Sequence, residues 1–405
     1  MRQRVVITGV GAISGLGTDA QTMWNAMCQG QSAIKPLGDL AAGTRISVGS
    51  TVPDYEANKY FTGDELPLLD RFSQFAILAA RDALQDAGLS ADAQAISKAA
   101  AVIGTGCGGK QTDEETYAGL YRDKRKRAHP LTIPKGMPSA AASQVSQHLG
   151  ICGPVYSVAS ACASAAHAVL QGKLLIQAGM VDVALVGGSD TPFTYGLLKA
   201  WEALRVVSSD ACRPFSKDRS GMVLGEGAGM LVLESEKHAT ERGGRIYAEL
   251  AGCGLSSNAG HITRPDVEGI SSAIASALKD AGLKPEDIDY INAHGTATAT
   301  NDPAETAAIH AVFGTHARRL AISSSKSMLG HALGAASALE LIATVLAVYH
   351  DVVPPTMNFT GPGEGCDLDY VPNEARKQPV NTALSNAFAF GGLNAVLAVS
   401  SWRES

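Results

Sequence analysis

A stretch of this sequence recurs about 190 residues further along the chain, and this repeat constrains the fold more than any other feature. Residues 83–89 read ALQDAGL and residues 277–283 read ALKDAGL, and each closes an alanine-rich helical pattern at a glycine. A short β-rich run that ends in small residues follows each copy. A repeat of this length predicts two similar βαβ-rich halves packed against each other, because solenoid repeats are much shorter.

Two further pairs of segments extend the repeat. Residues 155–175 resemble residues 320–346, since each reads as a strand, a turn of small residues and a helix rich in alanine and glycine. Residues 182–190 (DVALVGGSD) correspond in the same way to residues 382–392 (TALSNAFAFGG). The repeat therefore covers the strands as well as the helices of each half.

The chain is predicted to be an α/β protein in which helices are sandwiched between sheets. Alanine and glycine let a helix approach the backbone on two faces at once, so we expect alternating α and β layers. We place the boundary near residue 250, which gives a first half of residues 1–250 and a second half of residues 251–405. No low-complexity linker separates them, and we expect one inseparable unit.

The composition describes a compact, soluble protein. Hydrophobic residues make up 45% of the chain and charged residues 18%, which excludes a disordered chain. The net charge of −6 argues against a general binder of nucleic acid or anionic membranes, whose surface is normally basic. The amino-terminal segment lacks an apolar leader, and no window approaches the ~18 apolar residues of a membrane-spanning helix. We therefore expect a cytoplasmic protein with no membrane and no nucleic-acid partner.

The cysteines are odd in number and scattered, without a CxxC pair or a Cys/His pair at zinc spacing. They are Cys28, Cys107, Cys152, Cys162, Cys212, Cys253 and Cys366. Disulfides and structural zinc are therefore not expected.

Cys162 is the candidate nucleophile. It lies in SVASACASAAHAV, where a β-rich run changes to small residues and then to a helix. A thiol at a helix N-terminus is expected to favour the thiolate, and the free backbone N–H groups there bind a developing oxyanion. An isolated cysteine is more often a buried structural residue, so its context must decide.

Three segments of the second half supply that context. The first, AHGTATATNDPAE, carries His294 and Glu305. The second, SSSKSMLGHALGAA, carries Lys326 and His331 on a turn that leads into a helix. The third, SNAFAFGGLN, contributes Phe388, Phe390, Gly391 and Gly392. A single histidine is more often structural than catalytic, but these groups together indicate one site.

Together with Cys162, these motifs resemble the thiolase-like condensing enzymes, most closely the β-ketoacyl-acyl-carrier-protein synthases of type II, including the ketosynthases of nodulation clusters. Further matching motifs are RPFSKDRSGMVLGEGAGMLVLE at Arg213–Glu234, CDLDYVPNEAR at Cys366–Arg376 and PKGMPSAAA at Pro134–Ala142. The resemblance covers the whole chain. It implies a thiolase-like fold with αβαβα layers and a decarboxylating condensation that extends an acyl chain.

The resemblance also implies a role for each residue of the site. Cys162 is the acyl-accepting nucleophile, and His294 and His331 form the pair that handles the malonyl group. Lys326 supports them, and we expect it to pair with Glu305 and to orient His331. Acyl transfer needs an oxyanion hole, which we assign to the backbone N–H groups of Cys162 and Phe390, with Gly391 and Gly392 permitting the close approach.

Further residues are expected to shape the tunnel. By resemblance, Phe390 gates the site, and Cys107 faces the acyl pocket from a glycine-rich turn. Trp201 and Phe388 are bulky residues expected in the same gated tunnel. No cofactor or metal is required, since substrates arrive as phosphopantetheine thioesters on an acyl carrier protein.

The carrier-binding surface is less clear from the sequence. Residues 63–72 read GDELPLLDRF where the resemblance implies a basic cluster. Arg71, Arg205, Lys126 and Arg127 are candidate substitutes, since steering an acidic partner needs positive potential more than a fixed position. The run that contains Lys126 and Arg127 is also typical of a solvated loop.

Assembly and ion binding are implied only by the resemblance. The chain is expected to form a homodimer, with residues 134–147 and the strand before Cys162 near the two-fold axis, while a heterodimer with a second ketosynthase-like subunit remains open. Some family members hold a structural monovalent cation, which implicates Asn292, Glu340 and Asn386 here.

Two motif matches are rejected. Gly104, Gly106 and Gly109 match GxGxxG, but no clean βαβ unit with a ribose-binding acid follows, so a dinucleotide site is not predicted. SSSK at 323–326 matches SxxK without the KTG and SDN elements of penicillin-recognising enzymes.

Two rival functions stay open. A CoA-dependent thiolase needs a second reactive cysteine near the C-terminus, where this chain has FAFGGLN. A non-catalytic chain-length factor would have lost the nucleophile, whereas Cys162, His294, Lys326 and His331 are all present. The acyl chain length, its saturation and the pathway cannot be read from these motifs.

Overall fold

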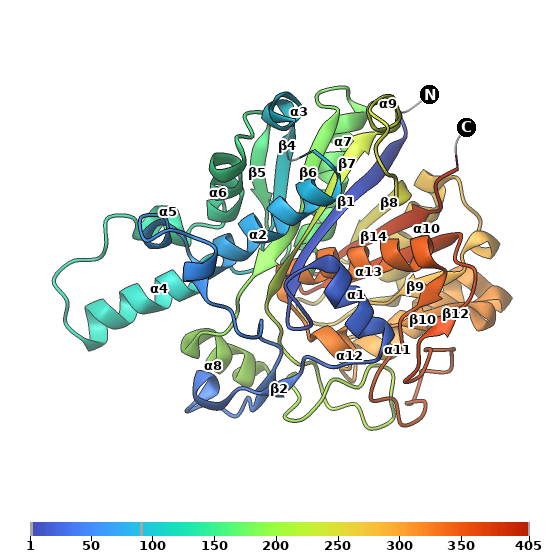
Figure 1. Cartoon of the computed structure of the whole chain (residues 1–405). Helices are drawn as coiled ribbons and strands as arrows, with labels where there is room; N and C mark the ends of the chain where they lie inside the picture. Colours follow the sequence, from blue (N-terminus) through green and yellow to red (C-terminus); the bar gives the residue numbers. More distant parts are fainter. Residues whose placement is uncertain (1–2, 90–91, 404–405) are drawn as a thin grey trace.

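A computed structural model of the chain describes residues 3–89 and 92–403, so the first two residues of the amino-terminal segment lie outside it. Among the described residues, ten strands form one sheet made of two five-stranded halves (Figure 1). The strands of the first half are β1 (Val5–Ser14), β4 (Ala100–Gly104), β5 (Val155–Val158), β6 (Val183–Asp190) and β7 (Gly227–Ser235). The strands of the second half are β8 (Ala248–Ser257), β9 (Tyr290–Asn292), β10 (Ala321–Ser323), β13 (Thr382–Ala389) and β14 (Leu393–Ser400).

The two halves of the sheet have the same topology. From the centre outward the first half runs β1-β7-β6-β4-β5 and the second runs β8-β14-β13-β9-β10. Strand directions match as well, since β4 lies parallel to β5 and β6 while β9 lies parallel to β10 and β13. The halves meet where β1 and β8 pair at Val6 with Glu249 and at Ile7 with Ala248. The duplication expected from the sequence is therefore confirmed strand by strand.

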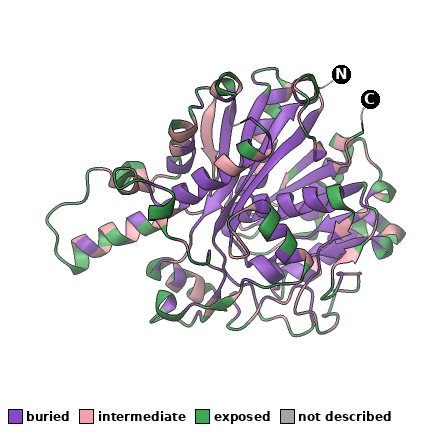
Figure 2. Ribbon diagram, in the orientation of Figure 1, coloured by how far each residue is buried: buried purple, intermediate pink, exposed green. Residues whose placement is uncertain are grey.

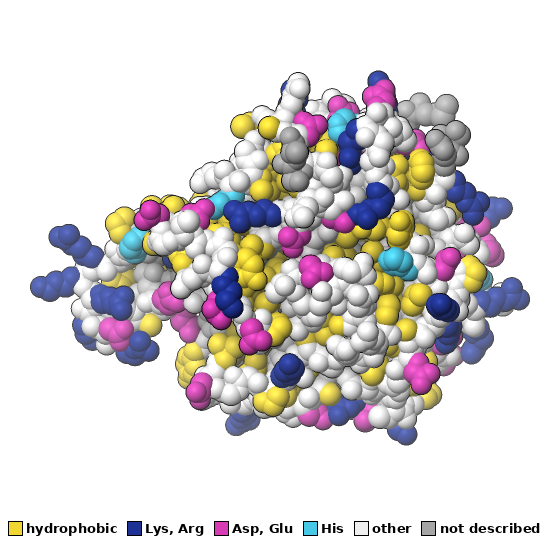
Figure 3. Space-filling view, in the orientation of Figure 1, with side chains coloured by type: hydrophobic (Ala, Val, Ile, Leu, Met, Phe, Trp, Pro, Cys, Tyr) yellow, Lys and Arg dark blue, Asp and Glu magenta, His cyan; other side chains and the backbone are white. Residues whose placement is uncertain are grey.

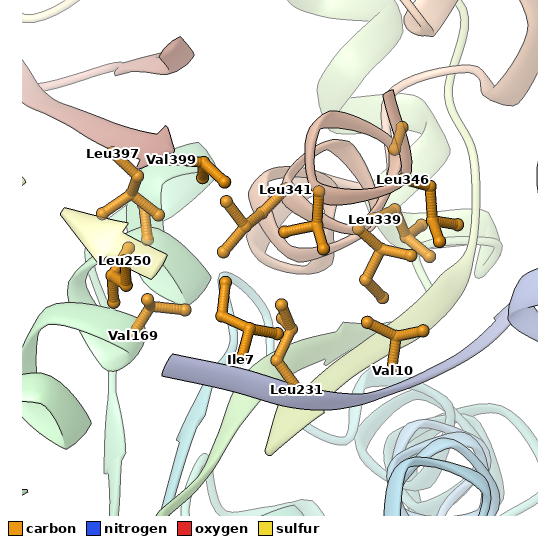
Figure 4. Packing of buried hydrophobic residues seen from close by; sticks show 14 of the residues in the cluster. Ile7, Val10, Val169, Leu231, Leu250, Leu339, Leu341, Leu346, Leu397 and Val399 are labelled. Carbon is orange, nitrogen blue, oxygen red and sulfur yellow. The ribbon is translucent and has the colours of Figure 1, made fainter. Parts of the chain in front are cut away.

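Two central helices, α7 (Ser164–Gln177) and α13 (Ala336–His350), fill the space between the two sheet halves. Figure 4 shows Val169 of α7 and Leu339 of α13 among side chains from β1, β7, β8 and β14. Figure 2 shows the same central region as almost continuously buried. The alanine- and glycine-rich sequences of these helices are explained by packing against strands on both sides.

The outer layers are formed by α2 (Arg71–Asp86) against the first half and α10 (Val267–Ala281) against the second. Each lies so close to its sheet that glycine is required in the strand below. A Cβ on Gly9 would lie 2.2 Å from the Ala83 carbonyl oxygen, and one on Gly254 would lie 2.0 Å from that of Ala273. Sheet halves with helices between and outside them make the predicted αβαβα arrangement, which is confirmed.

The remaining helices are α1 (Ala20–Cys28), α3 (Ala93–Lys98), α4 (Lys110–Tyr117), α5 (Thr132–Gly136), α6 (Ala140–Leu149), α8 (Tyr195–Leu204), α9 (Glu236–Glu241), α11 (Asn301–Phe313) and α12 (Lys326–Leu329). Short strand pairs are β2 (Lys35–Pro36) with β3 (Val48–Gly49), and β11 (Val352–Val353) with β12 (Arg376–Lys377).

One segment passes the length and hydropathy criteria for a membrane span, contrary to the expectation from sequence. It is Leu333–His350, which contains α13, and 89% of it is buried inside the protein. Its apolar character follows from its central position between the sheets, as for the core helix of a globular protein.

Helix α4 and the loop after it project from the body of the molecule (Figure 1). Residues 121–130 of this projection are exposed, and cationic side chains gather at its tip (Figure 3). The basic run that contains Lys126 and Arg127 therefore faces solvent.

Candidate active site

Cys162 lies in a sharp turn between β5 and α7. Ala161 adopts a φ of +49°, which is unfavourable for a residue with a side chain, and starts a short 3-10 turn over Ala161–Ala163. The Ser164 hydroxyl fastens this turn, because it accepts the N–H of Ser160 at 2.9 Å and donates to the Ala161 carbonyl at 2.6 Å. The turn directs Cys162 into a cavity while leaving it only 8% exposed.

His331 is the partner of Cys162. Its Nε2 lies 3.1 Å from Cys162 Sγ, and its backbone N–H donates to the Val223 carbonyl at 2.7 Å. Burial raises the pKa of Cys162 to about 12, which the positive charge of Lys326 offsets in part. Burial also holds the pKa of His331 well below its usual range. Both shifts in pKa favour the neutral thiol and the neutral imidazole, and burial thus acts against the thiolate that the helix N-terminus favours.

Lys326 is buried beside the second histidine. Its Nζ donates to the His294 carbonyl at 2.6 Å, lies 3.3 Å from His294 Nδ1 and forms an ion pair with Glu340. The predicted pairing with Glu305 was wrong, because the carboxylate that pairs with Lys326 is that of Glu340. Glu305 accepts instead the backbone N–H groups of His294 and Gly295, both at 2.8 Å. Its carboxylate holds the tight turn at Gly295, where φ is +38°, and α13 supplies the carboxylate for the lysine.

The contact with Lys326 sets the tautomer of His294. An ammonium group only donates, so Nδ1 is the acceptor and the neutral ring carries its hydrogen on Nε2. Burial, Lys326 and His331 together keep the pKa of His294 well below its usual range. The His294 ring lies 5.6 Å from that of His331 at 85°, and 5.9 Å from that of Phe388. Two neutral imidazoles therefore face the same small space.

A cavity of about 310 Å³ opens beside these groups. Both halves of the chain line it, so the site exists only where the halves meet. The lining residues are Cys162, Trp201, Leu204, Val206, Met222, Asn258, Ile262, Thr263, Arg264, Pro265, His294, Thr296, Thr298, Thr300, Asn301, His331, Phe388, Ala389, Phe390 and Asn394.

Phe390 and Trp201 stand together on the cavity wall, with ring centroids 6.1 Å apart. Phe390 comes directly after β13 and precedes a turn in which Gly391 and Gly392 have φ values of +83° and +71°. The Gly391 N–H donates to the Ile262 carbonyl at 2.7 Å. Paired glycines in the left-handed region allow the turn to place an aromatic side chain over the site.

Cys107 lies near the site but is not part of the cavity lining. It follows Thr105 and Gly106 in a loop bound by Asp190, whose carboxylate accepts the Thr105 hydroxyl at 2.7 Å and the N–H groups of Gly106 and Cys107 at 2.7 and 3.1 Å. Asp190 also accepts the Gly334 N–H at 2.6 Å, although burial raises its pKa to about 6. Asp190 was not predicted as a residue of the site. The sequence signal that could have indicated it is a single acidic residue at the end of a strand that carries no other charged residue.

The three residues implicated in cation binding are fully buried and offer oxygen atoms. Two of these oxygens, Glu340 Oε2 and Asn386 Oδ1, have no hydrogen-bond partner among the described residues. Asn292 Oδ1 accepts the Ser325 hydroxyl at 3.3 Å. Unpaired buried oxygens are the chemistry that a hard monovalent cation needs, so Asn292, Glu340 and Asn386 fit such an ion. Within residues 3–89 and 92–403, no cluster of three or more His, Cys, Asp or Glu side chains could hold a metal ion.

The candidate carrier-binding residues differ in their surroundings. Arg71 turns inward, where its guanidinium donates twice to the buried Glu226 carboxylate and lies over Tyr55 and Phe75. Arg205, Lys126 and Arg127 are exposed. Arg71 therefore has an internal structural role in this chain, while the other three cations face solvent.

The site consists of a thiol in contact with an imidazole, a second imidazole facing the same cavity and a buried lysine, and duplicated halves share it. This arrangement and the fold are those of the thiolase-like condensing enzymes. The family models agree, since the beta-ketoacyl synthase N-terminal domain matches residues 2–239 and its C-terminal domain matches residues 247–360. This chain belongs to the beta-ketoacyl synthase family.

Known relatives extend over the whole chain. It is 52% identical to nodulation protein E of Rhizobium sp. (strain N33) over 402 residues, which cover 98% of this chain and 99% of the relative. It is 40% identical to 3-oxoacyl-[acyl-carrier-protein] synthase 2 of Coxiella burnetii over 408 residues, again covering 98% and 99%.

Solved structures give the same result. The ishigamide ketosynthase/chain length factor matches with a TM-score of 0.95 at 37% identity, over 100% of both chains. AntDE:AntF, a type II acyl-carrier protein in complex with its ketosynthase, matches with a TM-score of 0.92 at 33% identity, over 99% of this chain and 100% of that chain.

Proposed function

We propose that this chain is a β-ketoacyl-acyl-carrier-protein synthase that accepts an acyl group on Cys162 and condenses it with a malonyl thioester after decarboxylation. The observation that carries the proposal is the 3.1 Å contact between Cys162 Sγ and His331 Nε2, with His294 facing the same cavity. A structural cysteine needs neither a neutral imidazole at that distance nor an open cavity beside it. A chain-length factor needs no such pair.

In the first half-reaction, the acyl group moves from the carrier thiol to Cys162. His331 Nε2 accepts the thiol proton as sulfur attacks the thioester carbonyl, because burial raises the pKa of the thiol and a base beside it helps it to ionise. The backbone N–H groups of Cys162 and Phe390 stabilise the oxyanion. Collapse of the tetrahedral intermediate breaks the bond to the carrier sulfur, which takes the proton from His331.

In the second half-reaction, the malonyl group loses CO2 and its thioester becomes an enolate. His294 donates Nε2–H to the enolate oxygen, since Lys326 holds Nδ1 as an acceptor. His331 Nδ1 has no hydrogen-bond partner among the described residues, so nothing fixes the ring hydrogen on that atom. Once Cys162 is acylated, the ring hydrogen of His331 moves from Nδ1 to Nε2, and Nε2–H then donates to the same enolate oxygen. The enolate carbon then attacks the acyl carbonyl, the C–S bond breaks, and Cys162 takes up one proton as the β-ketoacyl carrier leaves.

We further infer that the chain works in the cytoplasm as a dimer of two-half subunits, divided near residue 250, with acyl carrier protein as its substrate carrier. β5 is a four-residue strand at the edge of the sheet, next to the turn of Cys162, and an edge strand of this kind is normally covered. Exposed Arg205, Lys126 and Arg127 supply positive potential for an acidic carrier.

The test is intact-mass analysis of the wild type and Cys162→Ala after incubation with acyl carriers of varied chain length, followed by malonyl carrier. The wild type is expected to gain one acyl group and to lose it as β-ketoacyl product when malonyl carrier is added, while Cys162→Ala gains none. A wild type that stays unmodified with every acyl carrier contradicts the proposal for the isolated chain, and acylation restored by a co-purified second subunit would identify a heterodimer.

A further inference from the structure

Helix α8 forms part of the wall of the cavity beside Cys162, although little packing holds this helix in place. Trp201 and Leu204 of α8 line the cavity. Within α8, whose residues are all described, Leu198 is the only buried one. A helix that buries a single side chain gains little stability from packing, so its position depends on the polar contacts at its ends.

The N-terminal end of α8 is bound by a carboxylate from another helix. The first N–H groups of a helix have no acceptor within the helix, and Thr194, at the N-cap position, makes no side-chain hydrogen bond to them. Glu114 of α4 accepts the Tyr195 N–H at 2.7 Å with one carboxylate oxygen and the Gly196 N–H at 2.6 Å with the other. A paired, charge-assisted contact of this kind fixes direction as well as distance, so it ties α8 to α4.

Helix α4 is itself fixed to the body of the protein at the end that carries Glu114. The buried Asp70 accepts the Phe72 N–H of α2 at 3.2 Å with one carboxylate oxygen. Its other oxygen accepts the N–H of Thr112 on α4 at 2.8 Å and the Thr112 hydroxyl at 2.6 Å. The other end of α4 leads into the part of the chain that projects into solvent (Figure 1). Glu114, two residues after Thr112, therefore holds α8 from an anchored position.

We propose that Glu114 is a positioning residue of the acyl cavity, because its carboxylate holds α8 at a fixed distance from α4 and so sets the space that Trp201 and Leu204 leave for an acyl chain. The inference rests on the proposed function and concerns which acyl chains the same site accepts. Glu114 is not among the described residues that line the cavity, so it acts through α8. Without its carboxylate, the N-terminal end of α8 is released, and the wall yields to chains that the wild type excludes.

The experiment measures the rate of Cys162 acylation by intact mass with a series of saturated acyl carriers of increasing chain length. The readout is the rate for the first chain that the wild type excludes, divided by the rate for the chain that it loads best. Glu114→Leu is expected to raise this ratio about tenfold while loading the best chain within about threefold of wild type. Glu114→Gln keeps one oxygen acceptor and should give an intermediate ratio. Glu115→Gln is the matched control and should keep the wild-type ratio, because Glu115 is exposed on the same helix and accepts a hydrogen bond from Gln111 of that helix at 3.0 Å.

A second substitution separates the tie to α4 from simple capping of α8. Thr194→Asp, added to Glu114→Leu, gives α8 an N-cap carboxylate of its own without a link to α4. It is expected to restore the thermal midpoint and to leave the ratio of loading rates as in Glu114→Leu. Restoration of the ratio by Thr194→Asp, an unchanged ratio in Glu114→Leu, or equal loading of every chain length by the wild type overturns the inference and leaves the condensing function intact. Failure of every chain to acylate the wild type overturns the proposed function and the inference together.

Discussion

The two halves of the molecule build the same turn twice and use it differently. Before α7, Ala161 has a φ of +49° and starts a 3-10 turn, and before α13, Leu333 has a φ of +49° and starts another. The second residue of the first turn is Cys162, whose thiol enters the cavity. The second residue of the other turn is Gly334, whose N–H is bound by Asp190. One copy of the turn carries a reactive group, and the other fixes the position of a neighbour.

The two copies also hold each other. Asp190 of the first half binds the turn before α13, while Ser337 of the second half accepts the Ala166 N–H near the start of α7 at 3.0 Å. Each central helix is therefore capped from the opposite half. Duplicated backbone geometry therefore does not require duplicated chemistry. The residue at the second position of the turn, Cys162 in one copy and Gly334 in the other, decides which copy carries a reactive group.

The largest expected effect is the loss of activity when the cysteine of the first turn is replaced. Cys162→Ala should reduce condensation by a factor of at least about 10³ and leave the thermal midpoint within about 2 °C of wild type, because it removes the nucleophile and little buried volume. Product formation and thermal unfolding measure the two effects. Substantial turnover by this variant would place the nucleophile elsewhere.

The equivalent change in the other turn should act on stability. A Cβ on Gly334 would lie 2.3 Å from the Gly106 backbone nitrogen and 2.6 Å from Asp190 Oδ2, so that neither neighbour can move away cheaply. Gly334→Ala is expected to lower the free energy of unfolding by about 3 kcal/mol. Denaturant unfolding checks this value. A variant as stable as wild type would show that the second turn is not locked.

The electrostatic role of the second half is tested by Lys326→Met. The Lys326 charge helps to lower the pKa values of His294 and His331, so its loss should raise both. The acidic limb of the malonyl decarboxylation profile, where a histidine becomes charged, should then move to higher pH. The pH dependence of CO2 release measures this.

Lys173→Met is the matched control. Lys173 lies on α7, is buried like Lys326 and forms an ion pair with Asp280, whose carboxylate is 2.9 Å from Lys173 Nζ. The variant should lower stability without moving the acidic limb. Equal shifts in both variants would mean that lost stability, and not the lost charge beside the histidines, changes the profile.

The smallest expected effect concerns Asp190. Its folded pKa of about 6 lies above the ordinary value of 3.8, so between these values the folded chain binds more protons than the unfolded chain. The Asp190 contribution to the free energy of unfolding should therefore fall as pH rises from about 4 to about 6. The Asp190→Asn variant lacks this contribution to the free energy of unfolding. The difference in free energy of unfolding between wild type and variant should therefore become smaller as pH rises from about 4 to about 6. The same dependence of unfolding free energy on pH in both proteins would contradict the raised pKa of Asp190.

Most of the architecture could be predicted, because the repeat and the motifs of the site are contiguous in sequence. Cys162, His294 and His331 were placed in one site from such motifs, and the structure brings them together. The partner of Lys326 could not be predicted, because Glu305 and Glu340 both follow a site motif and the choice depends on how α11 and α13 pack. Nor could the rise in the pKa of Cys162 be predicted, since the burial that causes it is a property of the folded chain.

Asp190 escaped prediction for a related reason. Its importance comes from the four donors that surround its carboxylate in three dimensions. A sequence motif records residue types, and it does not record whether a polar atom has been satisfied.

The contact between Cys162 and His331 joins the two halves, because the sulfur belongs to one and the imidazole to the other. The rate of turnover therefore depends sensitively on the relative position of the two halves. A relative shift of about 1 Å, too small to change the helix content, would separate sulfur from imidazole beyond hydrogen-bonding reach. As denaturant is added, activity should disappear before the circular dichroism of the helices changes.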